Sequence, residues 1–150
     1  MDMPLHAYAY VSTAREGLDV PELDALLADA TAFNRMAGVT GVLMFDGHRF
    51  LQYIEGPRDG LASVHARISN ARRHGSITQL AAGPIQARWF PRWTMANRQV
   101  EAGTLASIVA APWQGFILQP EHPGHGFALL LRAWTDGHGE LEPAAVSLGS

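Results

Sequence analysis

Four polar side chains lie where the surrounding sequence pattern calls for apolar residues: Tyr10, Asn34, Gln52 and Arg67. A buried phenol or amide needs hydrogen-bonding partners, because leaving one unpaired costs about 1–3 kcal/mol. Gln52 is the plainest case, since it interrupts the apolar run 50–54. These four residues are therefore candidates for a site that holds a polar ligand.

The pattern alone leaves a structural alternative open for each of them. Tyr10 would then be a core aromatic with a solvated hydroxyl, and Asn34 a helix-end residue. Gln52 would be an edge amide and Arg67 a solvated cation.

A central hairpin organises the elements that must position these side chains. The apolar runs 39–45 and 50–54 flank Asp46-Gly47, a pair that tolerates the positive φ angles of a tight turn. The sequence predicts further strands over 5–11, 76–85 and 93–98. It predicts helices over 19–36, from 56–59 to a C-terminus within the run 70–75, over 103–111 and over 126–134.

This order of elements predicts an α+β fold of the ferredoxin-like βαββαβ type, with a fifth strand and additional C-terminal helices. Both early helices are expected on one face of the sheet. The first and third strands are expected to be central neighbours. Tyr10 and Gln52 would then point toward the helices that carry Asn34 and Arg67, and the four side chains would line one cleft.

Composition narrows the class of protein. The chain has 150 residues, a mass of 16.3 kDa and 47% hydrophobic residues, which suits one compact domain. Its formal net charge of −3 offers no basic surface for nucleic acid. No apolar run approaches the roughly 20 residues that span a bilayer. We therefore expect a cytoplasmic protein that binds neither nucleic acid nor membrane.

Several kinds of catalytic or metal site are disfavoured. There is no cysteine, and the seven histidines show no paired ligand spacing. His122 and His125 are three residues apart, but a Pro-Gly pair separates them. Ser12 lacks the G-x-S-x-G elbow of hydrolases, and no glycine-rich phosphate loop precedes a helix. We expect no metal site and no enzyme.

Four spaced motifs resemble those of the BLUF domain, the blue-light sensor that uses FAD. They read YVS at 10–12, FNRMAGVTG at 33–41, FLQYIEG at 50–56 and RWFPRWTM at 88–95. They occur in the family's order, and the resemblance covers about residues 5–98. It implies a photoreceptor that binds FAD non-covalently.

The resemblance implies a role for each matched residue. Tyr10 corresponds to the photochemical electron donor, and Gln52 to the amide that joins its hydroxyl to flavin N5 and O4. Trp93 and Met95 lie on the strand whose alternative arrangements are implicated in signal output.

The other matched residues are expected to hold the cofactor. Asn34 corresponds to the asparagine at the flavin's pyrimidine edge, and Arg67 to a position beside the same end of the ring. Leu26 and Ile68 lie where apolar side chains sandwich the isoalloxazine. Phe33 departs from the family, which often places another polar flavin contact there.

We expect residues 1–98 to form the flavin-binding domain and 99–150 a C-terminal helical cap with a flexible tail, within one compact unit. Light would rearrange the hydrogen bonds among tyrosine, glutamine and flavin. The change would pass through Trp93, Met95 and residues 103–134 to a separate partner protein or a second copy of the chain.

Two other functions stay open at this point. A flavin-free interaction module would keep the fold without photochemistry, and Phe33 is the best argument for it. A small ferredoxin-like enzyme, such as an acylphosphatase or a cofactor-free monooxygenase, would need an anion-binding loop that the sequence lacks.

Overall fold

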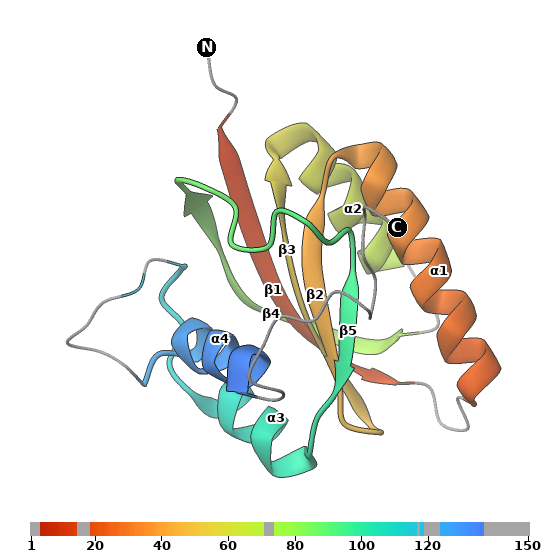
Figure 1. The fold of residues 1–150 in the computed structure, drawn as a ribbon, viewed down its shortest axis with the longest axis vertical. Coiled ribbons are helices and arrows are strands. Elements are labelled where there is room, and N and C mark those ends of the chain that lie inside the picture. The colour runs from red at the N-terminus through yellow and green to blue at the C-terminus, as the bar shows by residue number, and fades with distance from the viewer. Residues whose placement is uncertain (1–3, 15–18, 71–73, 117, 119–123, 137–150) are drawn as a thin grey trace.

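A five-stranded sheet in the order β4-β1-β3-β2-β5 forms the centre of the computed structural model (Figure 1). The structure describes residues 4–14, 19–70, 74–116, 118 and 124–136. The strands are β1 (Leu5–Ala14), β2 (Thr40–Phe45), β3 (Arg49–Pro57), β4 (His74–Ile85) and β5 (Ala96–Gln99), and the helices are α1 (Val20–Ala37), α2 (Arg58–Asn70), α3 (Ala102–Ala110) and α4 (Gly126–Asp136). The predicted ferredoxin-like layout with a fifth strand and C-terminal helices is confirmed.

The predicted hairpin joins β2 and β3. The Asp46 carboxylate accepts hydrogen bonds from the backbone N–H groups of His48 and Arg49, at 2.8 and 2.7 Å. Gly47 has a φ of 100°, a value that L side chains rarely adopt. The turn thereby fixes the register in which β3 presents Gln52.

Helix α1 has a defined beginning and end. Asp19 and Glu22 form a reciprocal capping box at its start, and Gly38 ends it with a φ of 74°. A Cβ on Gly60 would lie 1.9 Å from the Ala37 carbonyl oxygen, so a glycine lets α2 approach the end of α1 closely.

The sheet separates two hydrophobic cores, and helices cover both of its faces (Figure 1). The α1–α2 core contains buried Tyr10, Val39, Leu43, Phe50, Ile54, Leu61, Val64, Ile68 and Met95. The α3–α4 core includes buried Val42, Leu51, Tyr53, Phe90, Trp93, Leu105, Ile108, Phe127, Leu130 and Trp134. Successive strand residues alternate between the two cores, as the pleat of a strand requires.

The fifth strand differs from its prediction. It begins at Ala96, paired with Val42 in parallel, whereas residues 93–95 form no strand. The side chains of Trp93 and Met95 enter opposite cores. Residues two apart in a regular strand share a face, so the backbone has to leave strand geometry between them. The predicted tail beyond residue 136 lies outside the described residues.

A buried carboxylate fastens the segment that leads to β5. The Glu55 side chain is fully buried and accepts four hydrogen bonds. The donors are the Tyr53 hydroxyl at 2.8 Å, the Thr40 hydroxyl at 3.2 Å, and the backbone N–H groups of Trp89 and Phe90 at 2.8 and 2.6 Å. Burial raises the pKa of Glu55, while these bonds oppose the rise.

Arg88 adds a second attachment beside this carboxylate. Its guanidinium donates to the Thr40 hydroxyl at 2.9 Å and to the Gly38 carbonyl oxygen at 2.7 Å. Residues 88–90 are therefore tied to the end of α1 and to strands β2 and β3.

Glu55→Gln should destabilise the fold, because an amide nitrogen cannot accept the bonds that one carboxylate oxygen receives. The free energy of unfolding should fall by about 1–3 kcal/mol for each donor left unpaired. Denaturant unfolding measured by circular dichroism checks the change.

Tyr53→Phe is the matched control, because it removes one donor and keeps the ring. Its loss should be about 1 kcal/mol. A Glu55→Gln variant as stable as the unaltered chain would mean that the four bonds to Glu55 contribute little.

Candidate functional site

Tyr10 and Gln52 lie directly opposite each other in the antiparallel pairing of β1 with β3. Their side chains point to the same face of the sheet, toward the α1–α2 core. Directly opposed residues have Cβ atoms about 4.5–5.5 Å apart. Only 3% of Tyr10 and 7% of Gln52 is exposed, so the structure brings a phenol and an amide together in a largely buried place.

The Tyr10 hydroxyl is buried and has no hydrogen-bond partner among the described residues. Burial, and next the neighbouring Tyr8, raise the pKa of Tyr10 well above its usual value of 10.0. The phenol, already neutral near pH 7 at its usual pKa, therefore stays neutral over a wider pH range and has an O–H to donate. An unpaired buried hydroxyl requires an explanation, and a ligand that accepts its hydrogen bond is one.

Asn34 is buried near the end of α1, with 2% of its surface exposed. Its Nδ2 donates a hydrogen bond of 2.8 Å to the Thr94 carbonyl oxygen. The backbone carbonyl oxygen of Asn34 accepts a hydrogen bond of 2.9 Å from the Val39 N–H, which anchors the end of the helix. A side-chain amide has two N–H donors and an acceptor oxygen, so the bond to Thr94 uses only part of its capacity.

The remaining predicted cofactor residues divide into buried and peripheral ones. Ile68 is 7% exposed and belongs to the α1–α2 core. Leu26 is half-buried on α1. Among the described leucines of this helix, Leu23 and Leu27 are the ones that pack against the α1–α2 core. The exposed Arg67 side chain links α2 to α1, because its Cζ lies 5.0 Å from the ring centroid of Phe33.

Two aromatic neighbours of Tyr10 were not among the predicted site residues. The Tyr8 ring stacks on Tyr10 with centroids 5.7 Å apart. The His65 ring on α2 lies 4.8 Å from Tyr8 and 5.5 Å from Tyr10. The alternation of β1 already placed Tyr8 on the same face as Tyr10, whereas the sequence pattern offered no sign of the position of His65.

Trp93 and Met95, the predicted output residues, connect the two faces of the sheet. Met95 is fully buried in the α1–α2 core with Tyr10. Trp93 packs in the α3–α4 core, where its ring lies 6.1 Å from Phe90 and 5.8 Å from Trp134 on α4. A movement of residues 93–95 would therefore affect both cores.

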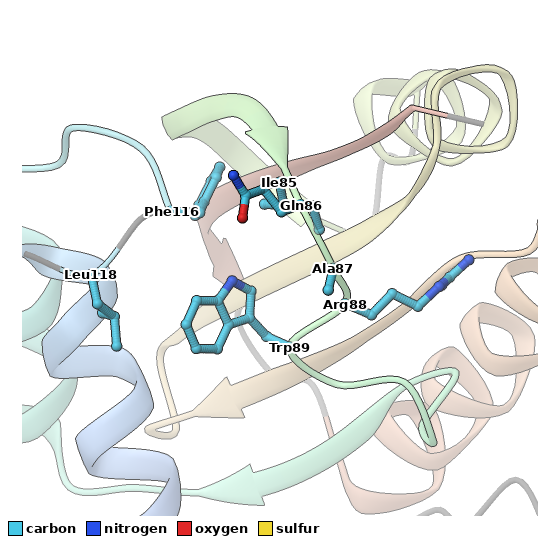
Figure 2. Close-up of a pocket in the computed structure, with 7 residues that line it drawn as sticks. All are labelled: Ile85, Gln86, Ala87, Arg88, Trp89, Phe116 and Leu118. Atoms are coloured by element: carbon cyan, nitrogen blue, oxygen red, sulfur yellow. The ribbon is translucent and has the colours of Figure 1, made fainter. Parts of the chain in front are cut away.

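A cavity of about 390 Å³ lies away from these residues, between residues 85–89 and the segment that joins α3 to α4. Figure 2 shows the Trp89 ring between Ala87 and Leu118. The Arg88 side chain points away from Leu118. None of the predicted cofactor residues lines this cavity. It is distinct from the Tyr10–Gln52 site.

Within the described residues, no group of three or more His, Cys, Asp or Glu side chains could hold a metal ion. No helix in the same part of the chain has the length and apolar character needed to cross a membrane.

Comparison with known proteins identifies relatives of the chain. The BLUF family, described as sensors of blue light using FAD, matches residues 5–96. The photoactivated adenylate cyclase subunit beta of Euglena gracilis is 31% identical over 101 residues, which are 67% of this chain and 12% of that protein. The blue light- and temperature-regulated antirepressor BluF of Escherichia coli (strain K12) is 31% identical over 81 residues, 54% of this chain and 20% of that protein.

Solved structures agree in fold. The dark-state structure of the BLUF protein BlrB is 31% identical, with a TM-score of 0.62 over 66% of this chain and 75% of that one. The BLUF structure of BlrP1 is 26% identical, with a TM-score of 0.63 over 92% of this chain and 95% of that one. The chain spans only a small part of the Euglena and Escherichia proteins, so the activities named for those proteins remain theirs.

The family match extends over more than half of the chain and includes Tyr10, Asn34 and Gln52. Together with the sheet order and the pairing of Tyr10 with Gln52, it establishes the kind of protein this is. The chain belongs to the BLUF family of flavin-binding blue-light sensors.

Proposed function

We propose that the chain binds FAD non-covalently between the sheet and helices α1 and α2, and that Tyr10 and Gln52 convert absorbed blue light into a structural change. The observation that carries this proposal is the buried Tyr10 hydroxyl, opposite Gln52, without a partner among the described residues. Bound FAD would supply the absorption of blue light and an excited state that accepts an electron.

Tyr10 has the properties of an electron and proton donor. Its phenol is protonated near neutral pH and its raised pKa extends that state to higher pH. A phenol becomes strongly acidic when it loses an electron, so electron loss would be accompanied by the release of a proton. The side chain directly opposite, Gln52, can accept that proton at its oxygen and present N–H groups on its other side.

Gln52 is suited to act as the switch because its two ends have opposite hydrogen-bonding characters. Rotation or tautomerisation would exchange donor and acceptor toward Tyr10 and toward the cofactor. The covalent structure of the cofactor would be unchanged after the cycle. If each hydrogen-bond arrangement favours a different protein conformation, the exchange of one arrangement for the other shifts the population between the two conformations.

The cofactor would be held by residues from both helices. Asn34 would bond to the pyrimidine edge with its second side-chain N–H and its side-chain oxygen, which the bond to Thr94 does not use. The buried Ile68 and the half-buried Leu26 would contact the ring faces. Arg67, paired with Phe33, would close the outer end between α1 and α2. The family description supports FAD as the flavin, and chromatography of the released cofactor distinguishes it from FMN.

Signal output would reach a separate partner protein or a second copy of the chain. Trp93 contacts Trp134, so a light-driven change at residues 93–95 would alter the packing of α4. Arg98 reinforces this connection, since it donates to the Trp134 carbonyl oxygen and its Cζ lies 4.5 Å from the ring centroid. Hydrogen exchange of residues 103–134 should differ between dark and light, and identical exchange would contradict this route.

A flavin-free interaction module is the alternative that one observation favours. Phe33 occupies a position where the family often has a polar contact, and it pairs with Arg67. Colour separates the two functions. The purified protein should be yellow and release FAD on denaturation, whereas a colourless protein that cannot be loaded with FAD would support the alternative.

Tyr10→Phe should leave FAD bound and abolish the reversible red shift, because the ring remains and the hydroxyl is lost. Gln52→Leu should have the same effect by removing the relay between Tyr10 and the cofactor. Absorption spectra before and after blue illumination check both variants.

Tyr8→Phe is the matched control, since it removes a hydroxyl from the same face of β1 without changing Tyr10. Its red shift should persist. A normal red shift in Tyr10→Phe or Gln52→Leu would require another donor or another network.

Asn34→Ala should weaken the retention of FAD, because one edge of the buried flavin would lose its partner. The dissociation constant should rise by about 5- to 150-fold, equivalent to about 1–3 kcal/mol. Titration of the flavin-free protein with FAD measures it. Arg35→Ala changes the next, exposed residue of α1 and should bind like the unaltered chain. Equal affinity of the two variants would place Asn34 outside the flavin contact.

A further inference from the structure

Residues 93–95 are held at two points before the regular pairing of β5 begins. The Gly41 N–H donates to the Trp93 carbonyl oxygen at 2.8 Å. The Asn34 amide donates to the Thr94 carbonyl oxygen at 2.8 Å. The β2–β5 ladder starts only at Ala96. Asn34 therefore holds the middle of a short segment that has no strand pairing of its own.

This segment passes from one hydrophobic core to the other. Trp93 is 4% exposed in the α3–α4 core, and Met95 is fully buried in the α1–α2 core. Thr94 lies between them. A displacement of the Thr94 carbonyl would therefore disturb the packing of both neighbours, because close-packed cores transmit small shifts.

The side chain that holds Thr94 is itself well positioned. Asn34 is 2% exposed, and its backbone carbonyl accepts the Val39 N–H where α1 ends. One side-chain N–H serves Thr94, which leaves the second N–H and the oxygen for a ligand. A single buried amide can thus contact the cofactor and residues 93–95 at the same time.

We infer that Asn34 is a positioning residue for signal output, which couples the state of the flavin site to residues 93–95 through its hydrogen bond to the Thr94 carbonyl. This inference rests on the proposed function, in which Asn34 contacts the flavin. It adds a connection from α1 to the output segment that does not pass through Gln52. Because coupling between two sites is reciprocal, loosening this segment should also weaken the hold on the flavin.

The first test uses the flavin-free protein, since the bond to Thr94 involves protein groups alone. Asn34→Ala should accelerate amide hydrogen exchange in the peptide that covers 93–99 by about fivefold, the effect of losing one hydrogen bond. Mass spectrometry of peptic fragments measures the rate. Exchange that equals that of the unaltered chain would overturn the inference.

Thr94→Val is the matched control for that measurement. The Thr94 hydroxyl is buried and has no partner among the described residues, and the substitution keeps the carbonyl that Asn34 holds. Exchange over 93–99 should therefore stay close to that of the unaltered chain. Acceleration equal to that of Asn34→Ala would attribute the effect to local repacking and overturn the inference.

The second test compares dark and illuminated protein at saturating FAD. The red shift is recorded in the same samples. The light-dependent change in amide hydrogen exchange over 93–99 is divided by the size of that red shift. Asn34→Ala should lose at least half of this change, whereas Thr94→Val should keep it. A full change in Asn34→Ala would overturn the inference. Absence of a red shift in the unaltered chain would overturn the proposed function and, with it, the coupling to the flavin. The flavin-free test would then still show whether Asn34 holds residues 93–95.

Discussion

The antiparallel pairing of β1 with β3 is the constraint on which the site depends, because it places Tyr10 directly opposite Gln52 on the face covered by α1 and α2. A shift of one residue in that register would turn one of the two side chains toward the α3–α4 core. The Asp46-Gly47 turn and the neighbouring β2–β3 ladder hold β3 in position. The fold thereby keeps a phenol and an amide adjacent in a buried place, despite the cost of desolvating both.

The two faces of the sheet differ in composition. One face carries the polar residues proposed for the cofactor, and the other carries the aromatic core in which Trp93 meets Trp134. Residues 93–95 cross between these faces. The preceding residues 88–90 are fixed by Glu55 and Arg88, so movement near Thr94 begins from an anchored point. This arrangement suits a segment that has two discrete positions.

The sequence was sufficient to predict most of the fold and the placement of Tyr10 and Gln52 on neighbouring strands, because hydrophobic periodicity and the Asp-Gly turn are local signals. The resemblance to the BLUF family supplied the roles of the residues. Interactions between distant segments could not be predicted in this way. The bond from Asn34 to Thr94 joins residues 60 positions apart, and the contacts of His65 depend on how α2 docks. Residues 93–95 carry β-prone side chains, yet tertiary packing on opposite faces overrides that preference.

The most direct test of the central claim is nuclear magnetic resonance of the FAD-loaded protein in the dark, with the glutamine side-chain amides labelled with ¹⁵N. If Gln52 lies between Tyr10 and the flavin, its side-chain N–H protons should exchange slowly with water and show nuclear Overhauser contacts to the Tyr10 ring. Rapid exchange of these protons, or contacts to side chains of the α3–α4 core instead, would contradict the proposed arrangement.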